Sequence, residues 1–294
     1  MKKSIKTITR IFSTVLMLFM AMNLNAKAPK TAVRKVKKEV QIVEKKEVSS
    51  VVVLATDGID ILKEFGADDL ISAVGKEVPG AEESGKSIIF AGEEAVESII
   101  SYLPDLVLLE PGKYEELAQE LDERGVEWME LDARSIQDIM NMILDIGDIL
   151  NRDIDAQAAV SEFEEKLKLL KELDKPETPV TVYCEASCEP YTAYGAKSLI
   201  SDLLEKAGAA NVFGYINTNT MEVREETIIE KDPMVILIPQ NTGITVEDVM
   251  AREGWSEIQA IKNGRVYVID TSVICRQSSA CLDSVYTLSE LLAE

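Results

Sequence analysis

The sequence predicts an α/β protein of two Rossmann-like lobes, each with a parallel sheet, joined by a long rigid helix. Short β-branched runs alternate with segments of helical periodicity in residues 50–134, and the alternation returns in residues 176–294. Between them, residues 135–175 carry helical spacing and no strand-like run. Strands that alternate with helices are typical of parallel sheets covered on both faces.

The first lobe is predicted over residues 50–134, where apolar runs end in turn signals. The run 50–55 leads into Thr56-Asp57-Gly58, which is typical of a buried strand that ends in a polar turn. Pro104 and Gly125 end the second and third helical segments. The predicted strands are residues 50–55, 70–74, 87–90, 105–109 and 126–131, and the predicted helices are residues 59–65, 96–103 and 114–124.

The linking segment is predicted over residues 135–175. Its apolar residues recur at helical spacing, and a break is expected at 151–153. Pro176 and Pro179 mark its end. The apolar positions include Ile136, Ile139, Met140, Ile143, Ile146, Ala156, Val160, Phe163, Leu167 and Leu170.

The second lobe, residues 176–294, repeats the plan of the first. An apolar run at 234–238 follows Pro233 and ends in Pro239-Gln240-Asn241. The predicted strands are residues 180–184, 234–238 and 264–270, and the predicted helices are residues 198–207, 223–231 and 283–292.

An internal repeat relates the two lobes. In residues 97–109 and 226–238, a Glu opens a helix, a Pro follows seven residues later, and an apolar run then forms a strand. Glu97 and Glu226 therefore occupy equivalent positions. A Glu in the first helical turn also opposes the helix dipole, which gives either residue a purely local role as an alternative.

The N-terminus has the layout of a secretory signal peptide. Basic residues precede a short apolar run, and small Ala26 follows it, so residues 1–26 are predicted to be removed. No cysteine lies near this position, which predicts a periplasmic protein without a lipid anchor. Residues 27–49 are rich in Lys and lack a sustained period, and we expect a basic mobile tail there.

Charge and composition exclude several classes of function. The net charge is −21, so nucleic acid is not an expected partner. The chain has no histidine, which removes Ser-His and Cys-His catalysis and the commonest metal ligand. We expect neither an enzyme nor a resident cofactor.

Four cysteines are candidates for disulfide bonds in an oxidising compartment: Cys184, Cys188, Cys275 and Cys281. Their pairing cannot be chosen from the sequence, because four cysteines allow three full pairings. A thiol-based metal carrier is the alternative function. The C-x3-C and C-x5-C spacings differ from tight zinc pairs, so no metal site is predicted.

Several motifs in order resemble a known family. They are Phe65-Gly66-Ala67-Asp68-Asp69, Leu103-Pro104-Asp105-Leu106-Val107-Leu108, Lys206-Ala207-Gly208-Ala209-Ala210-Asn211-Val212-Phe213, Asp232-Pro233-Met234-Val235-Ile236-Leu237, Arg252-Glu253-Gly254-Trp255 and Ala260-Ile261-Lys262-Asn263-Gly264-Arg265-Val266-Tyr267. Residues 50–294 thereby resemble the periplasmic substrate-binding proteins of ABC importers for iron-siderophore, haem and cobalamin.

The resemblance implies a monomeric receptor that binds a small-molecule metal chelate and delivers it to a permease dimer in the inner membrane. It also implies that Glu97 and Glu226 dock the two lobes on the two permease subunits. Two departures fall in regions that face the ligand in the family: the segment 275–281 replaces a proline-rich turn, and Cys188 stands in the loop after the first strand of the second lobe.

Ligands of open α/β sheets bind beyond the carboxyl ends of the strands. This rule predicts ligand contacts from Thr56, Asp57, Phe90 and Tyr114 in the first lobe, and from Cys188, Tyr191, Tyr194, Asn217, Gln240 and Arg276 in the second. Arg276 is the clearest cation among them, so a neutral or cationic chelate fits better than a tri-anionic one. A cleft enzyme that uses Asp57 with Glu185 is the second alternative function.

Overall fold

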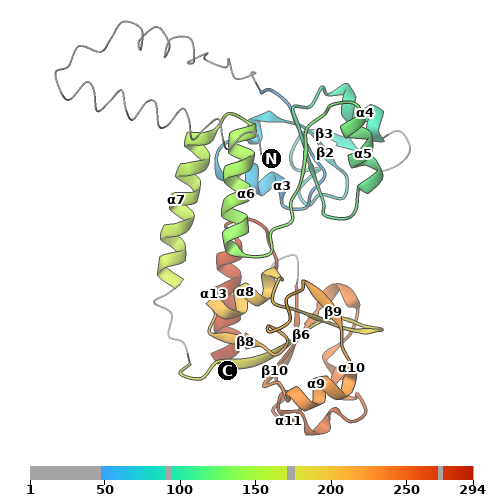
Figure 1. The fold of residues 1–294 in the computed structure, drawn as a ribbon, viewed down its shortest axis with the longest axis vertical. Coiled ribbons are helices and arrows are strands. Elements are labelled where there is room, and N and C mark those ends of the chain that lie inside the picture. Colours follow the sequence, from blue (N-terminus) through green and yellow to red (C-terminus); the bar gives the residue numbers. More distant parts are fainter. Residues whose placement is uncertain (1–47, 91–94, 171–175, 271–273, 294) are drawn as a thin grey trace, which may run out of the picture. The chain divides into compact units, whose positions relative to one another are not determined.

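The computed structural model describes residues 48–90, 95–170, 176–270 and 274–293, shown in colour in Figure 1. The predicted signal peptide and nearly all of the predicted tail lie outside the described residues. Within the described ranges, none of the helices combines the length and apolar character that a membrane crossing requires.

The first lobe contains a five-stranded sheet in the order β3-β2-β1-β4-β5, with every neighbouring pair parallel. Its strands are β1 (Val51–Val53), β2 (Ile71–Gly75), β3 (Ser87–Ile89), β4 (Leu106–Leu109) and β5 (Trp128–Glu130). The central strands β1 and β4 are buried along their whole length, as expected of strands covered on both faces. All five strands were predicted, with small shifts at their ends.

Helices cover both faces of this sheet. Ile61 of α3 (Gly58–Glu64) and Ile143 of α6 (Ile136–Ile149) join the core on the face that carries Val51 and Val53. On the other face, α4 (Ala95–Ser101) and α5 (Glu115–Glu123) pack on the side of Val52 and Val107. A short 3₁₀ helix, η1 (Asp68–Leu70), leads into β2. The lobe is therefore a three-layer α/β/α unit (Figure 1).

The linking segment consists of two helices, α6 and α7 (Asp153–Leu169), which lie side by side (Figure 1), whereas the sequence predicted one long helix. The expected break is confirmed, because Asn151 has a φ of 57° and turns the chain after α6. The two helices approach closely at Gly147, where an added Cβ would stand 2.3 Å from the Cβ of Ala156.

The sheet of the second lobe follows the order β11-β10-β6-β7-β9, with β8 also paired to β6. Its parallel part contains β6 (Val180–Cys188), β8 (Ala209–Asn211), β10 (Val235–Pro239) and β11 (Val266–Ile269). The strands β7 (Tyr191–Tyr194) and β9 (Thr220–Glu222) run antiparallel to their neighbours. The sheet is thus mixed, whereas the sequence predicted a parallel sheet with a loop at Cys188.

The second sheet is also covered on both faces. One face packs against α8 (Leu199–Lys206) and α13 (Cys281–Ala293). The other face packs against α9 (Glu225–Lys231) and a buried Trp255. The remaining elements are α10 (Val246–Met250), α11 (Gln259–Lys262) and the 3₁₀ helices η3 (Gln240–Thr242) and η4 (Trp255–Glu257).

The internal repeat has a structural counterpart in the two helix-to-strand turns. Leu103 follows α4 with a φ of 48°, and Asp232 follows α9 with a φ of 44°. Each residue directly precedes the proline of its repeat, Pro104 or Pro233. The proline cannot continue the helix, and the left-handed residue before it turns the chain toward β4 or β10. The two lobes therefore share this local design.

Candidate functional site

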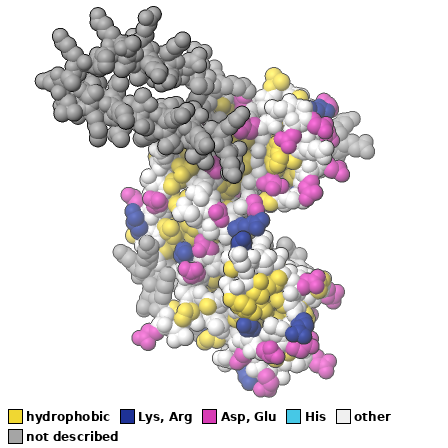
Figure 2. Space-filling view, viewed as in Figure 1, with side chains coloured by type: hydrophobic (Ala, Val, Ile, Leu, Met, Phe, Trp, Pro, Cys, Tyr) yellow, Lys and Arg dark blue, Asp and Glu magenta, His cyan; other side chains and the backbone are white. Residues whose placement is uncertain are grey.

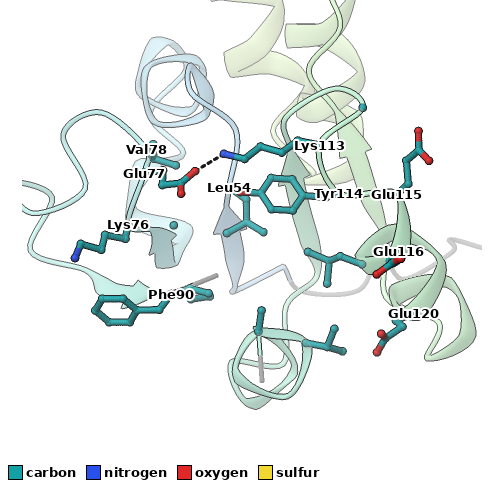
Figure 3. A pocket seen from close by; sticks show the side chains of 16 residues that line it. Leu54, Lys76, Glu77, Val78, Phe90, Lys113, Tyr114, Glu115, Glu116 and Glu120 are labelled. Atoms are coloured by element: carbon teal, nitrogen blue, oxygen red, sulfur yellow. Dashed lines mark hydrogen bonds and ion pairs between the residues drawn. The ribbon is translucent and has the colours of Figure 1, made fainter. Parts of the chain in front are cut away.

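A cavity of about 920 Å³ lies at the carboxyl ends of the strands in the first lobe. It opens where the strand order reverses between β1 and β4, which is the usual ligand position in open α/β sheets. The predicted residues Phe90 and Tyr114 line it, as Figure 3 shows. The full lining is Leu54, Gly75, Lys76, Glu77, Val78, Ile89, Phe90, Ala95, Val96, Gly112, Lys113, Tyr114, Glu115, Glu116, Leu117 and Glu120.

Hydrogen bonds from backbone N–H groups to glutamate side chains hold the loop that carries one wall of the cavity. The N–H of Thr56 donates to Oε2 of Glu110 at 2.7 Å, which ties the end of β1 to the end of β4. The N–H of Gly112 donates to Oε1 of Glu130 at 3.0 Å, and Gly112 has a φ of 66°, which favours glycine. Tyr114 then precedes the first turn of α5.

An ion pair between Lys113 and Glu77 joins two walls of the cavity (Figure 3). The hydrogen bond between them raises the pKa of the Lys113 ammonium and lowers the pKa of the Glu77 carboxyl. The Nζ of Lys113 also lies 5.4 Å from the centre of the Tyr114 ring, and the Nζ of Lys76 lies 5.2 Å from that of Phe90. Each of the two lysines of the lining therefore lies over an aromatic ring, at cation–π distance.

Asp57 and Arg276 meet outside this cavity, in a group of contacts that we call the α3 junction. It comprises Asp57, Asp60 and Glu64 of the first lobe and Arg276, Gln277 and Ser279 of the second. Arg276 pairs with Asp60, and its Nε lies 3.6 Å from Oδ1 of Asp57. The N–H of Gln277 donates to Asp57 at 2.9 Å, and the N–H of Ser279 donates to Glu64 at 2.5 Å.

Burial is the main influence on the carboxyls of the α3 junction. It raises the pKa of Asp57 and of Glu64, against the lowering effect of the backbone hydrogen bonds that they accept. Arg276 contacts the carboxylates of Asp57 and Asp60 in this structure. Its contact with a ligand stays a prediction.

The predicted residues of the second lobe lie in three different settings. Tyr191 belongs to the β6–β7 hairpin, and its hydroxyl donates to Glu225 at 3.3 Å. Tyr194 packs against the core, where burial raises its pKa to about 12. Asn217 and Gln240 are exposed, and Cys188 is half-buried at the end of β6.

The carboxylate pair of the enzyme hypothesis does not form. Glu185 is fully buried and bonded to Arg252 at 2.7 and 2.8 Å, with the Tyr183 hydroxyl at 3.3 Å. Asp57 is bonded instead to residues of the α3 junction. Each carboxylate therefore has its own partner and a structural role.

The four cysteines are free thiols in this structure. Burial raises the pKa of Cys184, Cys275 and Cys281, that of Cys275 to about 12. Burial is the main cause of the shift at Cys184, to which Cys275 adds, and Cys188 stands four residues beyond Cys184 on β6. Disulfide formation stays a prediction. Over the described ranges, no group of three or more His, Cys, Asp or Glu side chains is arranged to hold a metal ion.

Glu97 and Glu226 are both exposed on equivalent helices, α4 and α9. Glu97 pairs with Arg124 at 2.7 Å. The neighbour Glu225 is half-buried and accepts bonds from Trp255 Nε1 at 2.7 Å and from Tyr191. Glu226 is therefore the carboxylate of this turn that faces solvent.

Acidic side chains are scattered over the visible face of the molecule (Figure 2).

The sequence reasoning missed the charged residues of the cavity. Lys76 and Glu77 directly follow the second predicted strand, and Lys113 lies in the turn after the fourth, so the strand-end rule itself could have found them. Glu116 and Glu120 lie about one helical turn apart on α5, and a position within a helix gives no such signal.

The chain is similar in sequence to periplasmic and ABC transporter substrate-binding proteins. The sequence model of a family described as periplasmic binding protein matches residues 51–273. The uncharacterized ABC transporter substrate-binding lipoprotein YvrC of Bacillus subtilis (strain 168) is 27% identical over 261 residues, which cover 84% of this chain and 80% of that protein. The vitamin B12-binding protein of Vibrio parahaemolyticus is 24% identical, with 83% and 89% covered.

A third relative is the Fe(3+)-citrate-binding protein YfmC of Bacillus subtilis (strain 168), 24% identical over 75% of this chain and 72% of that protein. The crystal structure of a possible iron-binding periplasmic solute-binding protein from Staphylococcus epidermidis superposes with a TM-score of 0.76. It is 23% identical and covers 85% of this chain and 100% of that one, so it supports the two-lobe fold.

Proposed function

Because the chain belongs to the periplasmic binding protein family, we propose that it is the periplasmic receptor of an ABC importer, which captures a metal chelate of the iron-siderophore, haem or cobalamin type and delivers it to the permease. The cavity at the carboxyl edge of the first lobe is the observation that carries this proposal. Its volume of about 920 Å³ lies within the ~300–1,000 Å³ range of small-molecule sites.

The chemistry of the cavity supports a chelate as the ligand. Phe90 and Tyr114 offer aromatic surface, and Leu54, Val78 and Ile89 add apolar surface to the lining. Planar or macrocyclic ligands bury large areas against such side chains. Two relatives are named as binding proteins for vitamin B12 and for ferric citrate, and these names support a metal chelate as the ligand.

Binding is tested by titrating the purified chain, from residue 27 onward, with cyanocobalamin, haemin, a ferric trihydroxamate and ferric citrate, using calorimetry. We expect saturable binding of one of these probes, weakened about tenfold or more by Tyr114→Ala, because truncating a buried aromatic contact commonly costs ~1–2 kcal/mol or more. Tyr286→Ala, an exposed tyrosine of α13 outside the cavity, is the matched control. Absence of binding by all four probes argues against the proposal.

We also propose that the exported protein carries no lipid anchor, although one relative is named a lipoprotein. The first cysteine of the sequence is Cys184, far from the predicted cleavage position at Ala26. N-terminal sequencing of exported protein tests this, with Lys27 expected as the first residue. A membrane-bound product that begins at Met1 would contradict it.

A further inference from the structure

We propose that the first-lobe cavity selects metal chelates that carry no net negative charge, and that the Glu77–Lys113 ion pair, together with Glu115, Glu116 and Glu120, produces this selectivity. The inference rests on the proposed function, because it assumes that the cavity holds the chelate. It names the charge class of that ligand from the side chains that line the cavity.

The ion pair crosses the end of the central strand. Glu77 follows β2 and Lys113 follows β4, and β1 lies between these two strands. Neighbouring strands are ~4.8 Å apart, so the two side chains together span about two strand spacings. Figure 3 shows them pointing toward one another, with Leu54 and Tyr114 beside them. Their exposed fractions of 64% and 46% leave both charged groups within reach of a ligand.

Carboxylates outnumber ammonium groups among the described residues of the lining. The lysines are Lys76 and Lys113, and the glutamates are Glu77, Glu115, Glu116 and Glu120. Glu77 neutralises Lys113. Across the described ranges, no cation forms an ion pair with Glu115, Glu116 or Glu120, and all three are exposed. Arg276, the cation that the sequence favoured, is held by Asp57 and Asp60.

A polyanionic chelate would therefore enter beside unpaired carboxylates and compete with Glu77 for Lys113. Like charges across a binding site disfavour the wrong ligand, and this repulsion contributes to specificity. A neutral chelate with amide or hydroxamate groups meets the opposite situation. The carbonyl oxygen of a free amide group can accept from Lys113 and the amide N–H can donate to Glu77, and hydrogen bonds to charged partners are the stronger ones.

The test compares probes of different charge on one protein. Cyanocobalamin is neutral, the trihydroxamate ferrioxamine B is cationic, and ferric citrate and a ferric tricatecholate are anionic. Affinities are measured by calorimetry at low ionic strength and again with 0.5 M salt. We expect a neutral or cationic probe to bind about tenfold or more tightly than either anion, with the ratio falling in salt because salt screens exposed charges.

Charge variants identify the residues responsible. The triple variant Glu115→Gln, Glu116→Gln, Glu120→Gln is expected to shift the anion-to-neutral affinity ratio about tenfold toward the anions. Glu77→Gln, which frees Lys113, is expected to shift the ratio in the same direction, and Lys113→Gln in the opposite direction. The control is Glu162→Gln, Glu164→Gln, Glu165→Gln, which changes net charge equally on exposed positions of α7 and should leave the ratio unchanged.

The outcomes separate the inference from the proposed function. Equal affinity for anionic and neutral probes, or an equal shift in the α7 control and the cavity variant, overturns the charge selectivity while leaving the receptor function in place. Failure of every probe to bind refutes both. Thermal unfolding followed by circular dichroism shows whether each variant is folded, and Glu77→Gln serves as the single-residue test if the triple variant is not.

Discussion

Arg252 holds the fully buried carboxylate of Glu185 with two bonds, at 2.7 and 2.8 Å. The guanidinium carbon also lies 4.6 Å from the centre of the Trp255 ring, and Trp255 Nε1 donates to Glu225 at 2.7 Å. A chain of contacts thus runs from β6 to the first turn of α9, the turn that presents Glu226.

Loss of one partner of this pair should destabilise the protein strongly. Arg252→Met leaves the Glu185 charge buried without its counter-ion, and we expect a loss of ~3–5 kcal/mol in the free energy of unfolding. Urea denaturation measures it. The double variant Arg252→Met, Glu185→Leu removes both charges and should recover part of the loss. A single variant within 1 kcal/mol of wild type would show that the pair carries little weight.

The docking assignment separates transport from ligand binding. Glu97→Ala and Glu226→Ala should retain chelate affinity and impair uptake into vesicles that contain the permease, most strongly in combination. Removal of one member of an interfacial charge pair typically costs ~2–5 kcal/mol. Glu123→Ala on α5 and Glu230→Ala on α9 are exposed controls. Normal uptake by the double variant would leave both glutamates with only a helix-dipole role.

The cysteines should react with thiol reagents at two very different rates in reduced protein. Cys188 and Cys275 are half-buried and Cys184 and Cys281 are buried, and burial raises the pKa of Cys184, Cys275 and Cys281. At pH 8 we therefore expect one thiol to react fast and three to react slowly with a chromogenic disulfide reagent. In denaturant, all four thiols should react fast. Cys188→Ser should remove the fast phase, and a fast phase that persists would contradict the assignment.

The same pKa shifts predict an alkaline dependence of stability. Thiols whose folded-state pKa is raised stay protonated while those of the unfolded chain ionise above about pH 9, so stability is complete below pH 9 and falls as pH rises toward about 12. Cys275→Ala should flatten this slope in urea unfolding at pH 8 to 10.5. An unchanged slope would mean that Cys275 does not titrate differently in the two states.

Gly147→Ala tests the contact between α6 and α7. In an open helix this change favours folding by ~1 kcal/mol. Here the new methyl group would stand 2.3 Å from Ala156, so we expect instead a loss of ~1–3 kcal/mol. Thermal unfolding gives the sign directly, and a stabilised variant would place the helices further apart.

The fold was largely predictable because buried parallel strands are continuous apolar runs, as in 106–109 and 235–239. The antiparallel strands β7 and β9 were missed because they mix polar and apolar residues and are only partly buried. Glu77 and Lys113 are 36 positions apart, and Arg276 and Asp60 are 216 apart. Pairs so far apart in the sequence leave no local pattern. The sequence could therefore indicate single candidate residues, but it could not indicate which charged side chains form ion pairs with each other.

The α3 junction has a consequence for how this receptor can diverge. Asp57 and Glu64 accept from the main-chain N–H groups of Gln277 and Ser279, and every residue except proline supplies such a donor. A substitution at 277 or 279 other than proline therefore keeps these two main-chain bonds between the lobes, whereas a change of Gln277 also removes the bond that its Oε1 accepts from the N–H of Ala133. The contact between the lobes at this point therefore tolerates sequence change at 277 and 279, and among substitutions at these two positions proline is the one that removes a main-chain donor.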